Sequence, residues 1–226
     1  MPVSRPRPQR GDFPPGTQRY GQSYLGAPLL WFPAPLADSR SGLILAGTHG
    51  DENASIVTLS CALRTLKPEL RRHHVVLAVN PDGCQLGLRA NARGIDLNRN
   101  FPAANWKEGE TVYRWNSAAE QRDVVLLTGE KPGSEPETRA LCQLIHQIHP
   151  AWVISFHDPL ACIEDPGHSE LGQWLADALP CRWWVASAMK RPVLLAAGAP
   201  ISACPVSPPN SRQYPPTKQR RNICRP

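Results

Sequence analysis

The stretch GLILAGTHGDENAS, from Gly42 to Ser55, indicates the fold of this 226-residue chain. Its first part, Gly42 to Gly47, is short, apolar and bounded by glycines, which is typical of a buried strand. From Glu52 to Leu66 the apolar residues recur with helical spacing. The stretch therefore predicts a strand that passes into a helix, with His49 and Glu52 at the turn between them.

Similar patterns continue along the chain. We expect further core strands at 75–79 and 152–156, an edge strand at 27–32, and helices at 135–148 and 169–178. Alternating strands and helices are typical of an α/β domain with parallel pairing. Residues 80–83 read as a turn, and the polar stretch 89–132 sustains neither period, so we expect it to be an irregular loop with a function, or disordered.

Composition limits the cellular setting. No apolar run approaches the roughly 18 to 20 residues of a membrane span, and the basic, proline-rich N-terminus lacks the apolar core of a secretory signal. The seven cysteines are scattered singly, which disfavours a disulfide framework or a cysteine-rich zinc site. We expect a cytoplasmic protein that does not bind membranes.

The net charge of +6 is unevenly distributed. Eight of the 25 basic residues lie in 181–226, where there is no acidic residue, so residues 1–180 carry 17 basic residues against all 19 acidic ones. Because the main part of the chain has no basic excess, we expect no nucleic-acid partner.

The histidines suggest a metal site. By itself, the turn has an ordinary explanation, in which Asp51 and Glu52 complement the helix dipole and His49 is a loop residue. However, His157 directly follows the strand predicted at 152–156, and the carboxyl ends of strands in an open α/β sheet lie at one edge. Two histidines and one glutamate leave a fourth position for water, as in catalytic zinc sites.

The loop between these residues carries Arg89, Asn98 and Arg99. Guanidinium groups bind carboxylates and developing oxyanions through paired hydrogen bonds, so these residues are candidates for substrate binding. A solvated basic loop is the alternative explanation, because most charged runs lie at the surface.

Four ordered motifs resemble the zinc carboxypeptidase family: HGDE at 49–52, NPDG at 80–83, R-x4-G-x-D-L-N-R-N-F at 89–101 and SFHDP at 155–159. The resemblance extends to about Leu179 and implies an α/β fold with a mixed β-sheet flanked by helices. It also implies Zn²⁺ ligands at His49, Glu52 and His157, oxyanion stabilisation by Arg89, and a grip on the substrate's terminal carboxylate by Asn98 and Arg99.

Within the family, the chain resembles a bacterial branch that acts in cell-wall recycling. That resemblance implies a zinc-dependent metallopeptidase (amidase) whose substrate is the murein tripeptide L-Ala-γ-D-Glu-meso-diaminopimelate, cut between D-Glu and diaminopimelate. Two alternatives stay open: a related zinc-dependent deacylase of N-acyl amino acids, and a non-catalytic remnant that binds zinc and peptide.

The chain departs from the family after Leu179. The family pattern requires a glutamate late in the chain as general base, on a strand reading approximately T-A-E-F-P, but no acidic residue follows Asp177. The tail is instead rich in proline and arginine, a composition that we expect cannot complete a buried strand and helix. We therefore expect an incomplete catalytic domain over 1–180, a disordered basic tail over 181–226, and impaired activity.

A shifted reading frame explains this tail. The codons for 188–196 can encode Y-E-T-P-G-S-F-G in the shifted frame, and those for 205–216 can encode C-I-T-A-E-F-P-P-I-S. The missing glutamate would then span the codons of Pro209 and Asn210. We interpret residues 181–226 as the correct gene translated out of frame.

Overall fold

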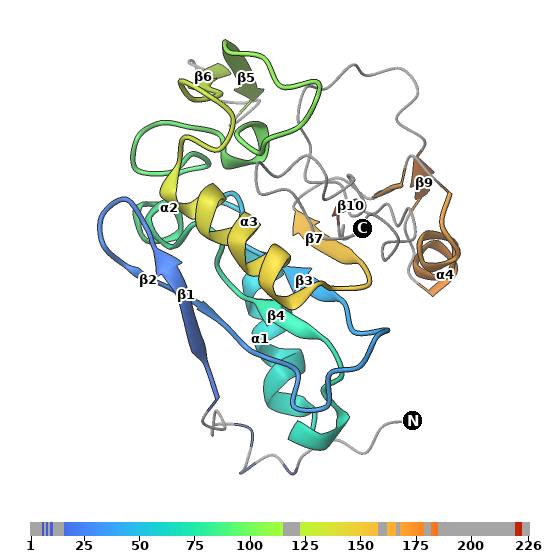
Figure 1. Ribbon diagram of the computed structural model, residues 1–226. Helices are drawn as coiled ribbons and strands as arrows, with labels where there is room; N and C mark the ends of the chain where they lie inside the picture. The colour runs from blue at the N-terminus through green and yellow to red at the C-terminus, as the bar shows by residue number, and fades with distance from the viewer. Residues whose placement is uncertain are drawn as a thin grey trace.

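The strand predicted at 42–47 is β3, Leu43–Leu45, and it lies inside a six-stranded sheet (Figure 1). The computed structural model describes residues 6, 8, 10, 16–114, 123–157, 162–165, 168–178, 182–184 and 220–222. The strand order is β4-β3-β7-β10-β8-β9, in which β10 pairs antiparallel with β8 and all other pairs are parallel. The sheet is therefore mixed, as the family resemblance implies. The remaining strands of this sheet are β4 (His74–Val76), β7 (Val153–His157), β8 (Cys162–Glu164), β9 (Arg182–Trp184) and β10 (Arg220–Asn222).

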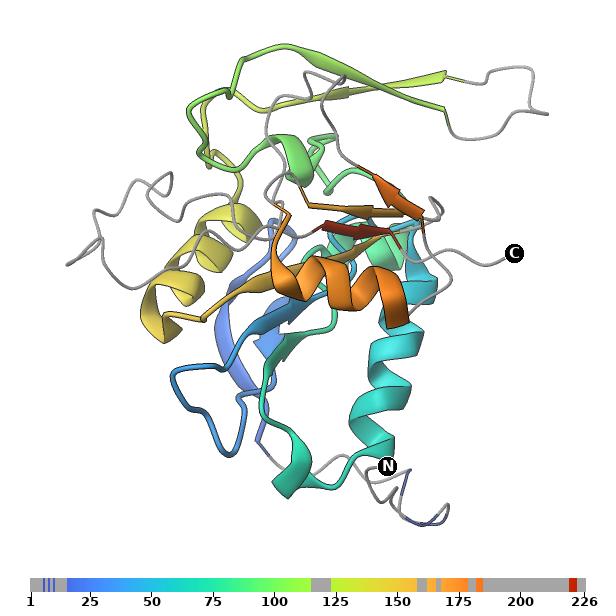
Figure 2. The same ribbon diagram turned by 90° about the vertical axis from the view of Figure 1, so that its right-hand side faces the viewer.

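Helices cover both faces of this sheet (Figure 2). Leu43, Leu45 and Val153 pack with apolar residues of α3, Pro136–Ile148, on one face. On the other face, strand residues such as Ile154 and Phe156 pack with α1, Asn53–Thr65, and α4, Glu170–Ala178. Successive side chains of a strand point to opposite faces, so each central strand contributes to both cores.

The predicted helices are confirmed to within a residue or two. α3 begins with Pro136 in its first turn, where the missing N–H costs nothing, and is capped after Ile148 by His149 in the left-handed conformation. Among the described residues, no helix combines the length and the apolar character that a membrane crossing requires.

Two predictions about irregular segments are wrong. Residues 80–83 begin a short helix, α2 (Pro81–Leu86), because the Asn80 side chain accepts a hydrogen bond from the backbone N–H of Gly83 and caps the helix. The stretch 89–132 contains a 3-10 helix, η3 (Leu97–Arg99), and a hairpin of β5 (Glu110–Arg114) and β6 (Asp123–Leu127). The hairpin is largely exposed on both faces, so its residues do not alternate between apolar and polar.

Two short segments of the tail pair with the sheet. β9 and β10 both lie beyond position 180, and β10 is inserted between β7 and β8. The catalytic domain over 1–180 and the disordered basic tail over 181–226 stay predictions. Unpaired strands accept any backbone that offers its N–H and C=O groups, whatever its side chains. Residues 185–219 and 223–226 lie outside the described part of the chain.

A second hairpin attaches to the domain through buried carboxylates. β1 (Gln18–Gln22) pairs with β2 (Pro28–Trp31), and Phe32, directly after β2, forms an antiparallel bridge with Val75 of β4. In the turn between them, the Ser23 hydroxyl donates to Asp82, and the backbone N–H of Tyr24 donates to Glu137. Both carboxylates are buried, and Trp31 of β2 packs in the core with Leu43, so the strand predicted at 27–32 lies at the edge of the domain beside β4.

Candidate metal centre

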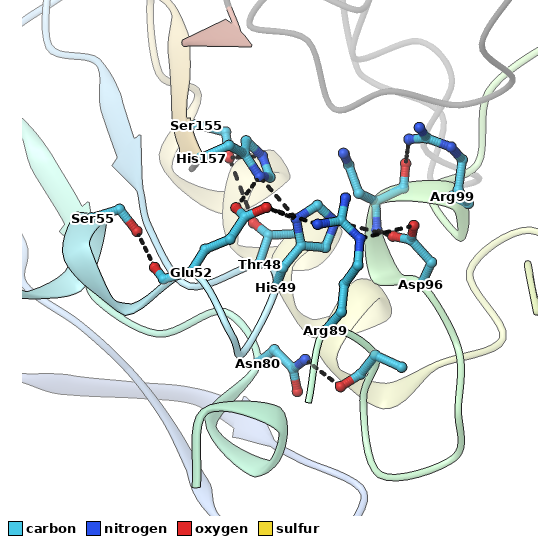
Figure 3. A network of polar contacts seen from close by, with 12 residues as sticks. Thr48, His49, Glu52, Ser55, Asn80, Arg89, Asp96, Arg99, Ser155 and His157 are labelled. Carbon is cyan, nitrogen blue, oxygen red and sulfur yellow. Dashed lines mark hydrogen bonds and ion pairs between the residues drawn. The ribbon is translucent and has the colours of Figure 1, made fainter. Parts of the chain in front are cut away.

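The three predicted metal ligands meet at the carboxyl edge of the sheet (Figure 3). His49 and Glu52 lie in the turn between β3 and α1, and His157 is the last residue of β7. Since β3 and β7 are parallel neighbours, their carboxyl ends are side by side. Sheet pairing therefore brings together residues that lie more than 100 positions apart in the sequence.

The ligand atoms of these residues face one another. Nδ1 of His49 lies 2.8 Å from Oε1 of Glu52, and Nδ1 of His157 lies 2.7 Å from Oε2 of the same carboxylate. The two Nδ1 atoms are 3.1 Å apart. All three side chains are buried, and each offers one ligand atom within 4.8 Å of the others.

The opposite ring nitrogens are held by side chains on the far side of the cluster. Nε2 of His49 is 3.1 Å from Oδ1 of Asp96, a carboxylate that can only accept, so Nε2 donates the hydrogen bond. Nε2 of His157 is 3.0 Å from the Ser155 hydroxyl, which can accept in the same way. Each Nδ1 faces the Glu52 carboxylate and, when it carries no proton, offers a lone pair to a cation. Lone pairs and a carboxylate that converge in a buried position fit a divalent cation.

Charge in the cluster favours the ionised carboxylates. Burial raises the pKa of the Glu52 carboxyl, but His49 and His157 outweigh it and hold this pKa well below its usual range. Burial also raises the pKa of the Asp96 carboxyl. His49 and Arg89 outweigh this effect and bring the pKa of Asp96 below its ordinary value. Both carboxyl groups are therefore negatively charged at neutral pH.

Arg89 joins the same cluster. Its Nη1 donates to Oε1 of Glu52 at 2.9 Å, and its Nε lies 4.0 Å from Oδ2 of Asp96. The guanidinium carbon also lies 4.3 Å from the centre of the Tyr113 ring. The structure thus places a mostly buried positive group, with 17% of its side chain exposed, directly beside the three predicted ligands.

Asn98 and Arg99 lie on η3, next to the cluster. The carboxylate of Asp96 accepts a hydrogen bond from the backbone N–H of Asn98 at 2.9 Å, and Nη1 of Arg99 donates to the Asn98 carbonyl at 3.1 Å. Both residues are buried. Asp96 therefore links this pair to His49, and the role of Asn98 and Arg99 in substrate binding stays a prediction.

Sequence reasoning did not identify Asp96 and Ser155. Asp96 lies inside the quoted motif at 89–101, but its role emerges only from its contact with His49, 47 positions away. Ser155 had a signal, because it is two residues before His157 on the same strand and so faces the same side of the sheet.

A buried histidine–glutamate–histidine cluster at the carboxyl edge of a mixed α/β sheet is the donor set of a zinc-dependent hydrolase. The family model for zinc carboxypeptidases matches residues 20–159, and the chain belongs to this family.

Two murein peptide amidases are among the similar proteins. The chain is 83% identical to murein peptide amidase A of Escherichia coli (strain K12) over 178 residues, which are 79% of this chain and 74% of that protein. It is 55% identical to murein peptide amidase A of Vibrio campbellii over 170 residues, 75% of this chain and 68% of that one.

Solved structures of the same fold also align with the chain. The crystal structure of murein-tripeptide amidase from Escherichia coli O157 aligns with a TM-score of 0.86, at 67% identity, over 99% of this chain and 90% of that one. Carboxypeptidase A from Helicoverpa armigera aligns at 15% identity with a TM-score of 0.58, over 91% of this chain and 58% of that one, and shares only the fold. The sequence alignment with the Escherichia coli O157 protein covers 79% of this chain at 83% identity. The structural alignment with the same protein extends to 99% of this chain, and the identity then falls to 67%. The residues that the longer alignment adds are therefore almost all different between the two proteins.

Proposed function

We propose that this chain is a zinc-dependent amidase of murein tripeptide, L-Ala-γ-D-Glu-meso-diaminopimelate, that hydrolyses the bond between D-Glu and diaminopimelate in the cytoplasm. The observation that carries the proposal is the buried His49–Glu52–His157 cluster in a chain 83% identical to a murein peptide amidase.

Zinc would be held by Nδ1 of His49, Nδ1 of His157 and the carboxylate of Glu52. The donor set fits, because Asp96 and Ser155 hold the opposite ring nitrogens and leave the Nδ1 lone pairs for a cation. When bound, zinc lowers the pKa of a water molecule and polarises a carbonyl.

The chain's own residues would supply the rest of the chemistry. The Arg89 guanidinium lies beside the ligands, where it would stabilise the negative charge that develops on the carbonyl oxygen in the transition state. Asn98 and Arg99, linked to the ligands through Asp96, would bind a carboxylate of the diaminopimelate residue. Such contacts orient the substrate before reaction.

We propose further that proton transfer is impaired in this chain. No acidic residue follows Asp177, so the glutamate that the family pattern requires as general base is missing. The loss of a proton-transfer group lowers the rate by about 10²- to 10⁴-fold. The fall in identity when the alignment extends from 79% to 99% of the chain supports a tail that is out of frame.

The experiment incubates the zinc-loaded chain with the tripeptide and measures released diaminopimelate by mass spectrometry. We expect slow release that is lost in His157→Ala, and no hydrolysis of N-acetyl amino acids, the substrates of a deacylase. Calorimetric binding of the tripeptide without any release would identify a non-catalytic remnant. Absence of both binding and release would refute the proposed substrate.

The gene itself tests the origin of the tail. We expect sequencing across codons 178–184 to reveal an insertion or a deletion. An intact frame there would refute the frameshift.

A further inference from the structure

Tyr113, on β5, contacts two parts of the site at once. Its ring lies under the Arg89 guanidinium, with 4.3 Å between the guanidinium carbon and the ring centre. Its hydroxyl donates a hydrogen bond to Asp51, the residue before Glu52, and burial together with this bond raises the pKa of Tyr113 to about 12. One side chain of the β5–β6 hairpin therefore touches both the metal turn and the arginine.

The hairpin that carries Tyr113 is connected to the centre through its backbone. β5 and β6 pair along their whole length, with Tyr113 opposite Val124. At the base of β6, the backbone N–H of Asp96 donates to the Leu127 carbonyl at 2.9 Å, and the N–H of Leu127 donates to Gly94 at 3.1 Å. Tyr113 lies on β5, β5 pairs with β6, and β6 is hydrogen-bonded to Asp96. Asp96 in turn contacts His49.

The other partners of Arg89 have further roles. Glu52 is the carboxylate that a metal ion would take, and Asp96 holds His49. The Tyr113 ring has no such competing role, and an aromatic face binds a guanidinium without occupying its N–H groups. The ring can therefore keep Arg89 in place while its N–H edge is available to a substrate oxygen.

We propose that Tyr113 is the positioning residue for Arg89: its ring holds the guanidinium at the metal centre through contacts that neither a metal nor a substrate displaces. This inference rests on the proposed function. It means that the β5–β6 hairpin helps to hold the arginine that would stabilise the transition state.

The first test measures the arginine directly, without catalysis. Phenylglyoxal modifies accessible guanidinium groups, and mass spectrometry of peptides gives the rate at Arg89 in the metal-free chain, with exposed Arg40 as the internal reference. We expect Tyr113→Leu to raise the Arg89 rate on the order of tenfold, as the loss of a partly buried cation–π contact implies. Tyr113→Phe keeps the ring, so it should stay within about twofold of the wild type.

The matched control is Val112→Ala. Val112 neighbours Tyr113 on β5 and pairs with Val125, but its side chain is exposed, so this change loosens the hairpin without touching Arg89. The rate at Arg89 should not change in this variant. An unchanged rate in Tyr113→Leu, or an equal rise in Val112→Ala, would refute the contact as the means of holding Arg89.

The second test separates positioning from general damage. Calorimetry compares the zinc-loaded variants for a phosphinic analogue of γ-D-Glu-diaminopimelate, whose tetrahedral anion resembles the transition state, and for diaminopimelate, which lacks that group. We expect Tyr113→Leu to weaken the phosphinate on the order of tenfold and diaminopimelate less than twofold. Equal losses for both ligands would refute a positioning role. If the wild type binds neither ligand, the proposed function fails, and the labelling rates alone decide the Tyr113 contact.

Discussion

Nδ1 of His157 lies 2.7 Å from Oε2 of Glu52, although the two residues are 105 positions apart. The contact depends on the parallel pairing of β3 with β7, which places the carboxyl ends of the two strands together. It also depends on Asp96 and Ser155, which orient the imidazoles from the far side. Each of these supports can be tested by itself.

Asp96 should control metal affinity without touching the metal. It accepts the hydrogen bond from Nε2 of His49 and so favours a ring whose Nδ1 can bind a cation. We expect Asp96→Ala to weaken zinc binding about 10- to 100-fold, measured by competition with a chelating dye. Glu130→Ala removes an exposed carboxylate and should have no effect. A zinc affinity in Asp96→Ala within twofold of the wild type would contradict the orienting role.

Gly50 should be required by the close approach of two backbones. A Cβ added at this residue would lie 2.0 Å from the carbonyl carbon of Gly83 and 2.4 Å from the backbone N of Cys84. Because backbone cannot yield as a side chain can, Gly50→Ala should displace the turn that carries His49 and Glu52.

We therefore expect Gly50→Ala to lose at least tenfold in zinc affinity, at temperatures where it is still folded by circular dichroism. Val57→Ala, on the exposed face of α1, is the control and should keep both stability and zinc affinity. Zinc binding in Gly50→Ala at wild-type strength would show that the turn has room to move.

Glu137 should make stability depend on pH. Burial raises the pKa of its carboxyl above the ordinary value of 4.5, although the backbone N–H of Tyr24 acts in the opposite direction. A carboxyl with a raised pKa in the folded state costs stability when it is ionised, and this cost disappears as the pH falls to 4.5 or below.

The measurement is the free energy of unfolding in urea for the wild type and Glu137→Gln. From pH 7 to pH 4.5, the wild type should gain stability relative to Glu137→Gln, which does not titrate. The exposed Glu130→Gln is the control and should follow the wild type at every pH. A difference between wild type and Glu137→Gln that stays constant with pH would contradict the shifted pKa.

The sequence predicted the central elements well. β3 and β7 are continuous apolar runs because helices cover both faces of the sheet, and α1 and α3 have helical apolar periods because one face of each packs against it. The metal cluster followed from these elements, because the edge of a parallel sheet brings together whatever follows its strands. Contacts such as Asp96 with His49 could not be predicted, since they depend on how the long loop folds back.

The errors have physical reasons. Asn-Pro-Asp-Gly is compatible with a turn and with a capped helix, and the Asn80 side chain stabilises the helix here. The β5–β6 hairpin was missed because exposed apolar residues, including Val112 and Val125, hide the alternation of a strand. β10 joins the sheet through backbone pairing, which leaves no apolar pattern in the sequence.

The central claim is that His49, Glu52 and His157 share one zinc ion, and zinc content by elemental analysis tests it most directly. After incubation with zinc and gel filtration, we expect one zinc ion per wild-type chain and much less than one in His157→Ala. His146→Ala, which removes a histidine of α3, should retain one zinc ion per chain. A folded wild type that retains no zinc, or a His157→Ala variant that retains as much as the wild type, would contradict the account.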